Sequence, residues 1–187
     1  MSFTPDDALD LLFPAELIPQ HVKDELPPDL HIRPLASTDY ERGHLSVLSV
    51  LTQAPDVGAQ AWAAQFNSMR GGGAGGVPAT YYILVVVSRE TDRIVGTGGV
   101  FIERKFLRGL GSVGHIEDIA VAREMQGKKL GLRIIQALTH VSEGVGCYKT
   151  ILNCSEANIA FYEKCGYEKR EVEMAKYAIG RAHTPRL

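Results

Sequence analysis

The sequence has little of several features that mark other classes of protein. Its 187 residues include three cysteines and one tryptophan, and the net charge is −2. An odd number of cysteines with no zinc-site spacing favours reduced thiols over a disulfide framework or a metal site. The near-neutral charge gives no electrostatic argument for a nucleic-acid partner. No apolar run reaches the roughly 18 residues of a membrane span, and the start, MSFTPDDALDLLF, lacks the basic segment of a secretory signal. We therefore expect a cytoplasmic protein without an integral membrane segment.

The composition is that of one folded domain with an additional N-terminal segment. Apolar residues make up 45% of the chain and charged residues 22%, which is ordinary for a globular protein. Four prolines between residues 14 and 28 repeatedly interrupt regular structure. We interpret residues 1–30 as an extension that packs across the domain surface or is partly mobile, with contact to a partner or a membrane as the alternative. Residues 31–187 are predicted to form the domain.

Apolar periodicity and turn residues predict the order of the elements. The predicted strands cover about 30–35, 81–88, 94–103, 115–122, 148–154 and 172–177, and the predicted helices cover about 40–51, 55–70, 130–141 and 156–164. Hairpins come first and a strand–helix–strand unit follows, so we expect an α/β (α+β) fold with a central mixed sheet and helices on its faces. The glycine-rich run 71–76 follows a helix and precedes a strand, the reverse of a dinucleotide-binding loop, and predicts a flexible linker.

One stretch carries most of the chemistry that the sequence predicts. Apolar strand 115–122 is followed by a glycine turn with two lysines, Lys128 and Lys129, and then by a helix with Leu130 at its start. A turn at a helix N-terminus presents free N–H groups and the positive end of the helix dipole, and such sites bind pyrophosphate. The pattern is not a Walker A loop, and taken alone it also fits an ordinary turn without a ligand.

Two acids lie side by side in this strand. Glu117 and Asp118 are costly in an apolar strand unless they are paired or functional, and we favour a functional role. Side chains alternate along a strand, so only one of the two can point directly at a given site unless the strand bulges. In the preceding strand, Gly96, Gly98 and Gly99 weaken β structure without benefit unless another group approaches the backbone closely.

These motifs resemble the GCN5-related N-acetyltransferase (GNAT) superfamily. Gln126 and Gly131 match the ends of its [Q/R]-x-x-G-x-[G/A] pyrophosphate loop, whereas Lys129 stands where the middle glycine is usual. Residues 158–167, NIAFYEKCGY, resemble the signature of its last helix. The blocks at 114–121, 146–149, 161–166 and 172–174 resemble more specifically the eukaryotic family of glucosamine 6-phosphate N-acetyltransferases. The resemblance covers about residues 31–177, and the proline-rich extension resembles that of fungal members.

The resemblance implies a fold, a reaction and an assembly. The fold is a mostly antiparallel mixed sheet whose central strand has a bulge. The reaction transfers the acetyl group of acetyl-CoA to the 2-amino group of glucosamine 6-phosphate, on the route to UDP-N-acetylglucosamine, without a metal. The assembly is a homodimer whose protomers share pocket residues. The alternatives are a GNAT enzyme that acts on a protein N-terminus or another small amine, and a non-enzymatic acyl-CoA-binding regulator.

The resemblance also implies roles for individual residues. The implied acetyl-CoA-binding residues are Ile119, Ala120, Val121, Gln126, Gly127, Lys128, Lys129, Leu130, Gly131, Leu132, Asn153, Asn158 and Tyr162. The implied acceptor-binding residues are Thr52, Lys105, Phe106, Leu107, Arg108, Glu117, Asp118, Ile119, Tyr148, Lys149 and Tyr177. The implied catalytic residues are Glu117, Asp118, Asn153 and Tyr162. One acid acts through water as the base, and Tyr162 assists the leaving thiolate, because a phenol can hydrogen-bond or protonate it. Arg108 and Tyr177 stand where some relatives have histidine and arginine, so phosphate contacts are expected to be redistributed.

Overall fold

The computed structural model describes residues 3–71 and 78–176. The chain divides into two compact units, Met1–Leu152 and Asn153–Leu187, and each is described by itself. Most of the predicted glycine linker and the predicted acceptor residue Tyr177 lie outside the described residues.

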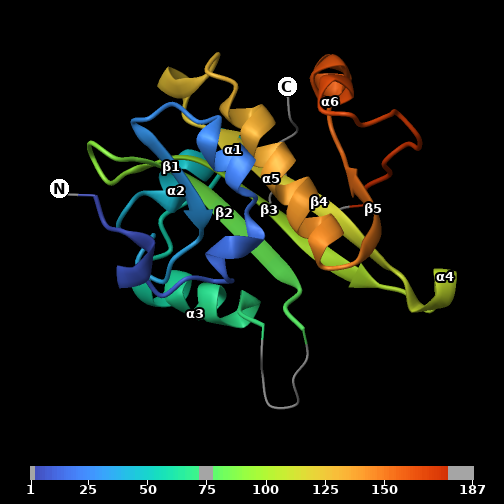
Figure 1. Ribbon diagram of the computed structural model, residues 1–187, viewed down its shortest axis with the longest axis horizontal. Helices are drawn as coiled ribbons and strands as arrows, with labels where there is room; N and C mark the ends of the chain where they lie inside the picture. The colour runs from blue at the N-terminus through green and yellow to red at the C-terminus, as the bar shows by residue number, and fades with distance from the viewer. Residues whose placement is uncertain (1–2, 72–77, 177–187) are drawn as a thin grey trace. The chain divides into compact units, whose positions relative to one another are not determined.

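The first unit is built on a five-stranded sheet (Figure 1). Its strands are β1 (Leu30–Pro34), β2 (Tyr81–Ser88), β3 (Ile94–Arg104), β4 (Ser112–Val121) and β5 (Cys147–Leu152). The spatial order is the order in the chain; β1 to β4 pair antiparallel, and β5 pairs parallel with β4. The predicted mixed, mostly antiparallel sheet is therefore confirmed.

The described residues of the two units contain six α-helices (Figure 1). The first unit contains α1 (Gln20–Asp24), α2 (His44–Leu48), α3 (Ala59–Met69), α4 (Leu107–Leu110) and α5 (Leu130–Gly144). The second unit contains α6 (Ile159–Lys164) after a 3-10 turn at Glu156–Asn158. The longest helix in the described residues, α5, has 15 residues, which is fewer than a bilayer-spanning helix requires.

Helix α5 packs on one face of the sheet through the apolar stripe that its sequence predicts. Leu130, Ile134, Leu138 and Val141 are all buried. The glycines in the strands make this packing possible, since a Cβ added at Gly98 would lie only 2.8 Å from Ile134 Cγ2. The glycines of β3 were predicted to let another group approach the backbone closely. That group is helix α5.

The opposite face of the sheet is covered in part by α2 and α3. Trp62 is buried and stacks on Phe66 with ring centroids 5.6 Å apart, so the single tryptophan belongs to the core. Its indole Nε1 donates to His44 Nδ1 at 3.4 Å, and His44 Nε2 lies 3.3 Å from Thr97 Oγ1 on β3. Burial lowers the pKa of His44 to about 4, so this ring is a neutral part of the core.

The described part of the N-terminal extension packs on the first unit. The side chains of Leu12 and Val22 are buried, and the Leu12 N–H donates to the Leu35 carbonyl at 2.8 Å, directly beyond β1. Glu25, just after α1, forms an ion pair with Arg133 of α5. These contacts hold the extension against both an end of the sheet and the helix that covers it.

The first predicted helix is shorter than expected. Residues 40–51 were predicted to be helical, but the helix covers only His44–Leu48. Asp39, just before the predicted range, is a residue type that often caps a helix N-terminus. The Asp39 carboxylate instead holds Arg33 in two hydrogen bonds of 2.7 Å and accepts the Ala36 N–H. The buried Arg33, six residues before Asp39, thus binds the carboxylate that could cap the helix, and Gly43, with φ +88°, is the residue from which the helix begins.

The predicted last strand, 172–177, is wrong for its described residues. Residues 172–176 form no strand, and Val172 and Met174 are 86% and 94% exposed. The described residues of the second unit contain no other strand. Alternating side chains alone do not produce a strand, because its backbone N–H and C=O groups also need hydrogen-bond partners.

Candidate functional site

Strand β4 has a bulge at the two adjacent acids. Glu117 pairs with Gly99 and Ala120 pairs with Thr97, so Asp118 and Ile119 together oppose a single residue of β3. Asp118 has φ +56°, a left-handed conformation that is uncommon for a residue other than glycine. This is the bulged central strand that the resemblance implies, and it is confirmed.

The bulge lets both acids reach solvent, which regular alternation of side chains would prevent. Glu117 and Asp118 are both exposed, whereas Ile116 before them and Ala120 after them are buried. The extra residue shifts the alternation of side chains by one position, so two neighbouring carboxylates both reach solvent. A Cβ at Gly98, opposite the bulge, would lie 2.5 Å from Ile119 Cδ1, so a larger residue at this position would force the Ile119 side chain to move.

The turn between β4 and α5 presents backbone donors. Gly127 has φ +82°, and no atom lies within 4 Å of the position that a Cβ would take there. In the described part of the chain, the N–H groups of residues 127–132 have no hydrogen-bond partner, and the first bond into the helix runs from Arg133 N–H to Lys129 O. Gln126 Nε2 donates to the Val121 carbonyl at 3.3 Å and connects the turn to the end of β4. The turn has the space, the donors and the dipole that a pyrophosphate needs.

Lys129 adopts the conformation that a glycine would adopt more easily. It lies immediately before α5 with φ 61° and ψ 17°, in the left-handed region. For a residue with a Cβ this conformation costs roughly 1–2 kcal/mol. The departure from the family pattern at this position therefore stores backbone strain, while the exposed ammonium beside Lys128 adds positive charge to the turn.

The predicted basic loop joins β3 to β4 and extends beyond the sheet at α4 (Figure 1). Lys105 Nζ lies 2.6 Å from Glu103 Oε1, so its charge is paired. The Arg108 guanidinium lies 6.0 Å from the ring centroid of Tyr148 on β5. The structure thus brings Arg108 to Tyr148, while Lys149 is exposed on the same strand. Phe106 and Leu107, also predicted, are exposed in this loop.

Thr52 is not joined to this loop by any polar contact in the described residues. It is exposed in the turn after α2, without a hydrogen bond or an ion pair to Lys105 or Arg108. The predicted role of Thr52 in binding the acceptor remains a prediction.

The second unit holds the other predicted residues. Asn153 and Asn158 are exposed, and Asn158 immediately precedes α6. Tyr162 on α6 is half-buried and packs edge-on against the rings of Phe161 and Tyr167, at centroid distances of 5.0 and 6.4 Å. Gly166, with φ +89°, ends the helix, as its sequence position predicts.

Sequence reasoning missed two polar residues beside the basic loop. His115 Nε2 lies 2.9 Å from Glu103 Oε2, and the His115 ring stacks on Phe101 with centroids 4.4 Å apart. The Lys105 ammonium and the His115 ring hold the pKa of Glu103 below its usual value. Alternation places Phe101 and Glu103 on one face, but only the register of β3 against β4 shows that His115 lies beside them.

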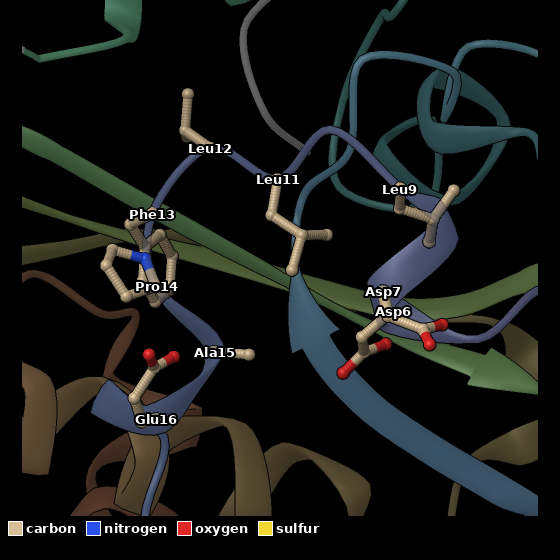
Figure 2. Close-up of a pocket in the computed structure, with 9 residues that line it drawn as sticks. All are labelled: Asp6, Asp7, Leu9, Leu11, Leu12, Phe13, Pro14, Ala15 and Glu16. Carbon is tan, nitrogen blue, oxygen red and sulfur yellow. The ribbon is translucent and has the colours of Figure 1, made fainter.

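The hollow in Figure 2 lies apart from all the predicted residues. It has a volume of about 500 Å³ and is formed by the N-terminal extension, with Asp6, Asp7 and Glu16 among its lining residues. Carboxylates repel anions, so this hollow is not suited to binding a sugar phosphate or the phosphates of a nucleotide cofactor.

Comparison with known proteins identifies the family of this chain. The profile of the Acetyltransferase (GNAT) family matches residues 48–167. The chain belongs to the GNAT acetyltransferase family. This GNAT chain is 40% identical over 148 residues to glucosamine 6-phosphate N-acetyltransferase 1 of Dictyostelium discoideum, covering 79% of this chain and 90% of the relative.

Further relatives agree with this placement. The glucosamine 6-phosphate N-acetyltransferase of Candida albicans is 40% identical over 149 residues, covering 80% of this chain and 96% of the relative. The crystal structure of glucosamine-6-phosphate N-acetyltransferase from Arabidopsis thaliana superimposes with a TM-score of 0.74 at 36% identity, covering 79% of this chain and 97% of that structure. The predicted family is confirmed, and relatives of similar identity occur outside the fungi.

Proposed function

We propose that this GNAT chain transfers the acetyl group of acetyl-CoA to the 2-amino group of glucosamine 6-phosphate. The products are N-acetylglucosamine 6-phosphate and CoA, which places the reaction in UDP-N-acetylglucosamine biosynthesis. The observation that carries the proposal is the bulge that exposes Glu117 and Asp118 in the strand leading to the donor-rich turn at residues 126–131. The names of the relatives agree with it.

The turn is suited to the diphosphate of acetyl-CoA. The N–H groups of residues 127–132 have no partner within the described chain, and the open space above Gly127 lets a ligand approach the backbone. Lys128 and Lys129 are exposed beside them and add charge. Together with Gln126, these residues hold the diphosphate, because anions are stabilised at a helix N-terminus. Asn153 and Asn158 are assigned further contacts on the cofactor side.

The acetyl group is placed beside the bulge. A bulge takes main-chain groups out of the regular ladder, so Ile119, Ala120 and Val121 offer main-chain groups to the acetyl and pantetheine portions. A donor aimed at the carbonyl oxygen stabilises the negative charge that develops there during attack, and this stabilisation lowers the barrier to acyl transfer.

The exposed acids bind and deprotonate the amine. Glucosamine 6-phosphate carries an ammonium group at neutral pH, and Glu117 and Asp118 attract it. One of the two takes its proton through a water molecule. The neutral amine attacks the carbonyl carbon, a C–N bond forms, and the C–S bond breaks. Tyr162 donates a proton to the departing thiolate, with Asn153 assisting, and its phenolate takes the second proton that the attacking nitrogen must lose to become an amide. Proximity supplies most of the acceleration.

The basic loop binds the phosphate of the acceptor. Lys105 and Arg108 supply positive charge, and Lys149 adds to it from β5. The remaining residues assigned to the acceptor pocket are Thr52, Phe106, Leu107, Tyr148 and Tyr177. This clamp separates a sugar phosphate acetyltransferase from a GNAT enzyme that acts on a peptide or on an uncharged amine.

The pocket is completed by a second copy of the chain in a cytoplasmic homodimer. Phe106, Leu107 and Leu110 are 95%, 71% and 71% exposed at the end of the β3–β4 loop. Clustered apolar side chains of this size are characteristic of protein interfaces. Because Lys105 and Arg108 belong to the same loop, its burial against a partner brings both protomers to the pocket.

A thiol-release assay tests the proposal. Acetyl-CoA is incubated with the protein and either glucosamine 6-phosphate or glucosamine, and free CoA is measured. We expect CoA release with the phosphorylated sugar at a kcat/KM at least tenfold above that with glucosamine, since a bound phosphate contributes more than about 1.4 kcal/mol. Equal rates contradict the phosphate clamp. No release with either sugar contradicts the acceptor and favours an acyl-CoA-binding regulator.

A further inference from the structure

A row of polar side chains runs along the face of β3 and β4 opposite α5. Gly98 and Gly114 face α5, because an added Cβ would contact Ile134 and Ser142 of that helix. Strand alternation therefore places Glu103 and His115 on the opposite face. Glu117, two residues beyond His115 and before the bulge, belongs to the same row.

Glu103 is held in this row from both sides. Its Oε1 accepts from Lys105 Nζ at 2.6 Å, and its Oε2 lies 2.9 Å from His115 Nε2. The His115 ring is fixed in turn by parallel stacking on Phe101, at 4.4 Å between centroids. A carboxylate with both oxygens engaged has little rotational freedom, so its position is defined by the sheet.

Lys105 is fixed at its backbone as well as at its ammonium. Its N–H donates to the Gly111 carbonyl at 2.9 Å, which closes the loop that contains α4. The four-carbon side chain between these two points is otherwise flexible, and ordering such a chain on binding costs affinity. An ammonium has three N–H donors, so the bond to Glu103 leaves two for a ligand.

We propose that Glu103, supported by His115, is a positioning residue that holds Lys105 ready to bind the acceptor's phosphate. This role rests on the proposed function, which assigns the phosphate to Lys105. Glu103 does not touch the reacting atoms, and its effect on the acceptor passes through the lysine. Ordering the ammonium before the acceptor binds removes that entropic cost from the binding step.

The opposing effect of Glu103 is repulsion of the phosphate. Water screens a half-exposed carboxylate, and two hydrogen bonds from Lys105 and His115 draw its charge away from a ligand. The positioning effect therefore exceeds the repulsion, and removal of the carboxylate weakens binding of the acceptor.

A double-mutant cycle on the acetyltransferase tests this role. Glu103→Gln keeps the size of the side chain but loses its charge, and we expect the KM for glucosamine 6-phosphate to rise roughly fivefold to tenfold with kcat within twofold. The kinetic constants for glucosamine, which lacks the phosphate, stay unchanged. In a Lys105→Ala background, Glu103→Gln has no further effect on KM, because the residue through which it acts is gone. Glu90→Gln, on the exposed β2–β3 turn, is the matched control and changes nothing.

Two substitutions of His115 separate positioning from packing. His115→Gln places an amide donor near the position of Nε2. We expect its KM for glucosamine 6-phosphate to stay within twofold of the wild-type value. His115→Phe keeps the stacking on Phe101 but loses the donor, and raises this KM about as much as Glu103→Gln. Equal KM values for the two His115 variants contradict the proposed support of Glu103 and Lys105 by the His115 hydrogen bond.

The outcomes distinguish this inference from the proposed function. A wild-type protein that acetylates both sugars equally refutes the phosphate clamp, and this role for Glu103 with it. A wild-type protein that prefers the phosphorylated sugar, with Glu103→Gln unchanged or with a lower KM, refutes the role of Glu103 alone. An effect of Glu103→Gln that persists without Lys105 also refutes it.

Discussion

Replacing Lys129 by glycine is expected to stabilise the protein relative to replacement by alanine. Lys129 has φ 61° and ψ 17°, so alanine retains the strain of the left-handed conformation and glycine relieves it. Both substitutions remove the same charge from an exposed side chain. The difference between the two variants therefore isolates the backbone, and we expect the free energy of unfolding to be about 1 kcal/mol higher for Lys129→Gly. In a chain of this length that corresponds to about 2–4 °C in Tm.

The neighbouring lysine provides the control. Lys128 is equally exposed but does not have a positive φ. Glycine at this position relieves no strain, so Lys128→Gly is expected to be less stable than Lys128→Ala, the opposite order to position 129. Thermal and urea unfolding of the four variants measure the comparison. Backbone strain at Lys129 is refuted if Lys129→Gly is no more stable than Lys129→Ala, or if both positions respond alike.

The same variants report on the cofactor site. Lys129→Gly and Lys129→Ala both lose one charge beside the diphosphate, and each is expected to raise the KM for acetyl-CoA roughly threefold. High salt reduces this difference, because screening weakens the attraction of exposed charges. If glycine alone lowers this KM, the conformation of the turn outweighs its charge.

Three further changes test the packing, the chemistry and the pH dependence. Gly98→Ala places a Cβ 2.5 Å from Ile119 Cδ1 and should lower the free energy of unfolding in urea by about 1–3 kcal/mol, whereas Gly144→Ala, with no atom within 4 Å, should leave it unchanged or slightly higher. Tyr162→Phe should lower kcat more than it raises the KM for acetyl-CoA in the thiol-release assay; an unchanged rate removes Tyr162 from the mechanism. Burial lowers the pKa of His44 from 6.5 to about 4, so the unfolded state binds more protons below pH 6.5. The contribution of His44 to stability is therefore complete above that pH and falls by about 3 kcal/mol on acidification to pH 4; denaturation series across this range should show this loss in the wild type and not in His44→Gln.

Elements with a strong local pattern could be predicted from the sequence. The apolar residues of α5 recur at steps of three and four, and β2 contains the apolar run 82–87, so the burial of each follows from its own residues. The end of α6 at Gly166 is likewise local, since a positive φ favours glycine. These predictions did not depend on which other part of the chain lies opposite.

Elements whose hydrogen-bond partners the local pattern does not specify were predicted less well. The helix predicted at 40–51 is shortened because Arg33, on β1, takes the carboxylate of Asp39. The strand predicted at 172–177 is absent from its described residues, and the alternation of side chains behind that prediction does not specify hydrogen-bond partners for the backbone. In both cases the local pattern was compatible with the predicted element but did not specify the hydrogen bonds that these residues form.

The candidate site divides in the same way. Two adjacent acids, a glycine turn with two lysines and the helix after it could be found from the sequence, because helix periodicity and turn chemistry are local properties. That Glu117 and Asp118 both reach solvent depends on the bulge, which requires Gly98 on the neighbouring strand to accommodate Ile119. The contact between Glu103 and His115 depends on the register of β3 against β4, which no local pattern specifies. Strand pairing brings residues far apart in the chain within hydrogen-bonding distance, and the sequence alone does not state which residues will pair.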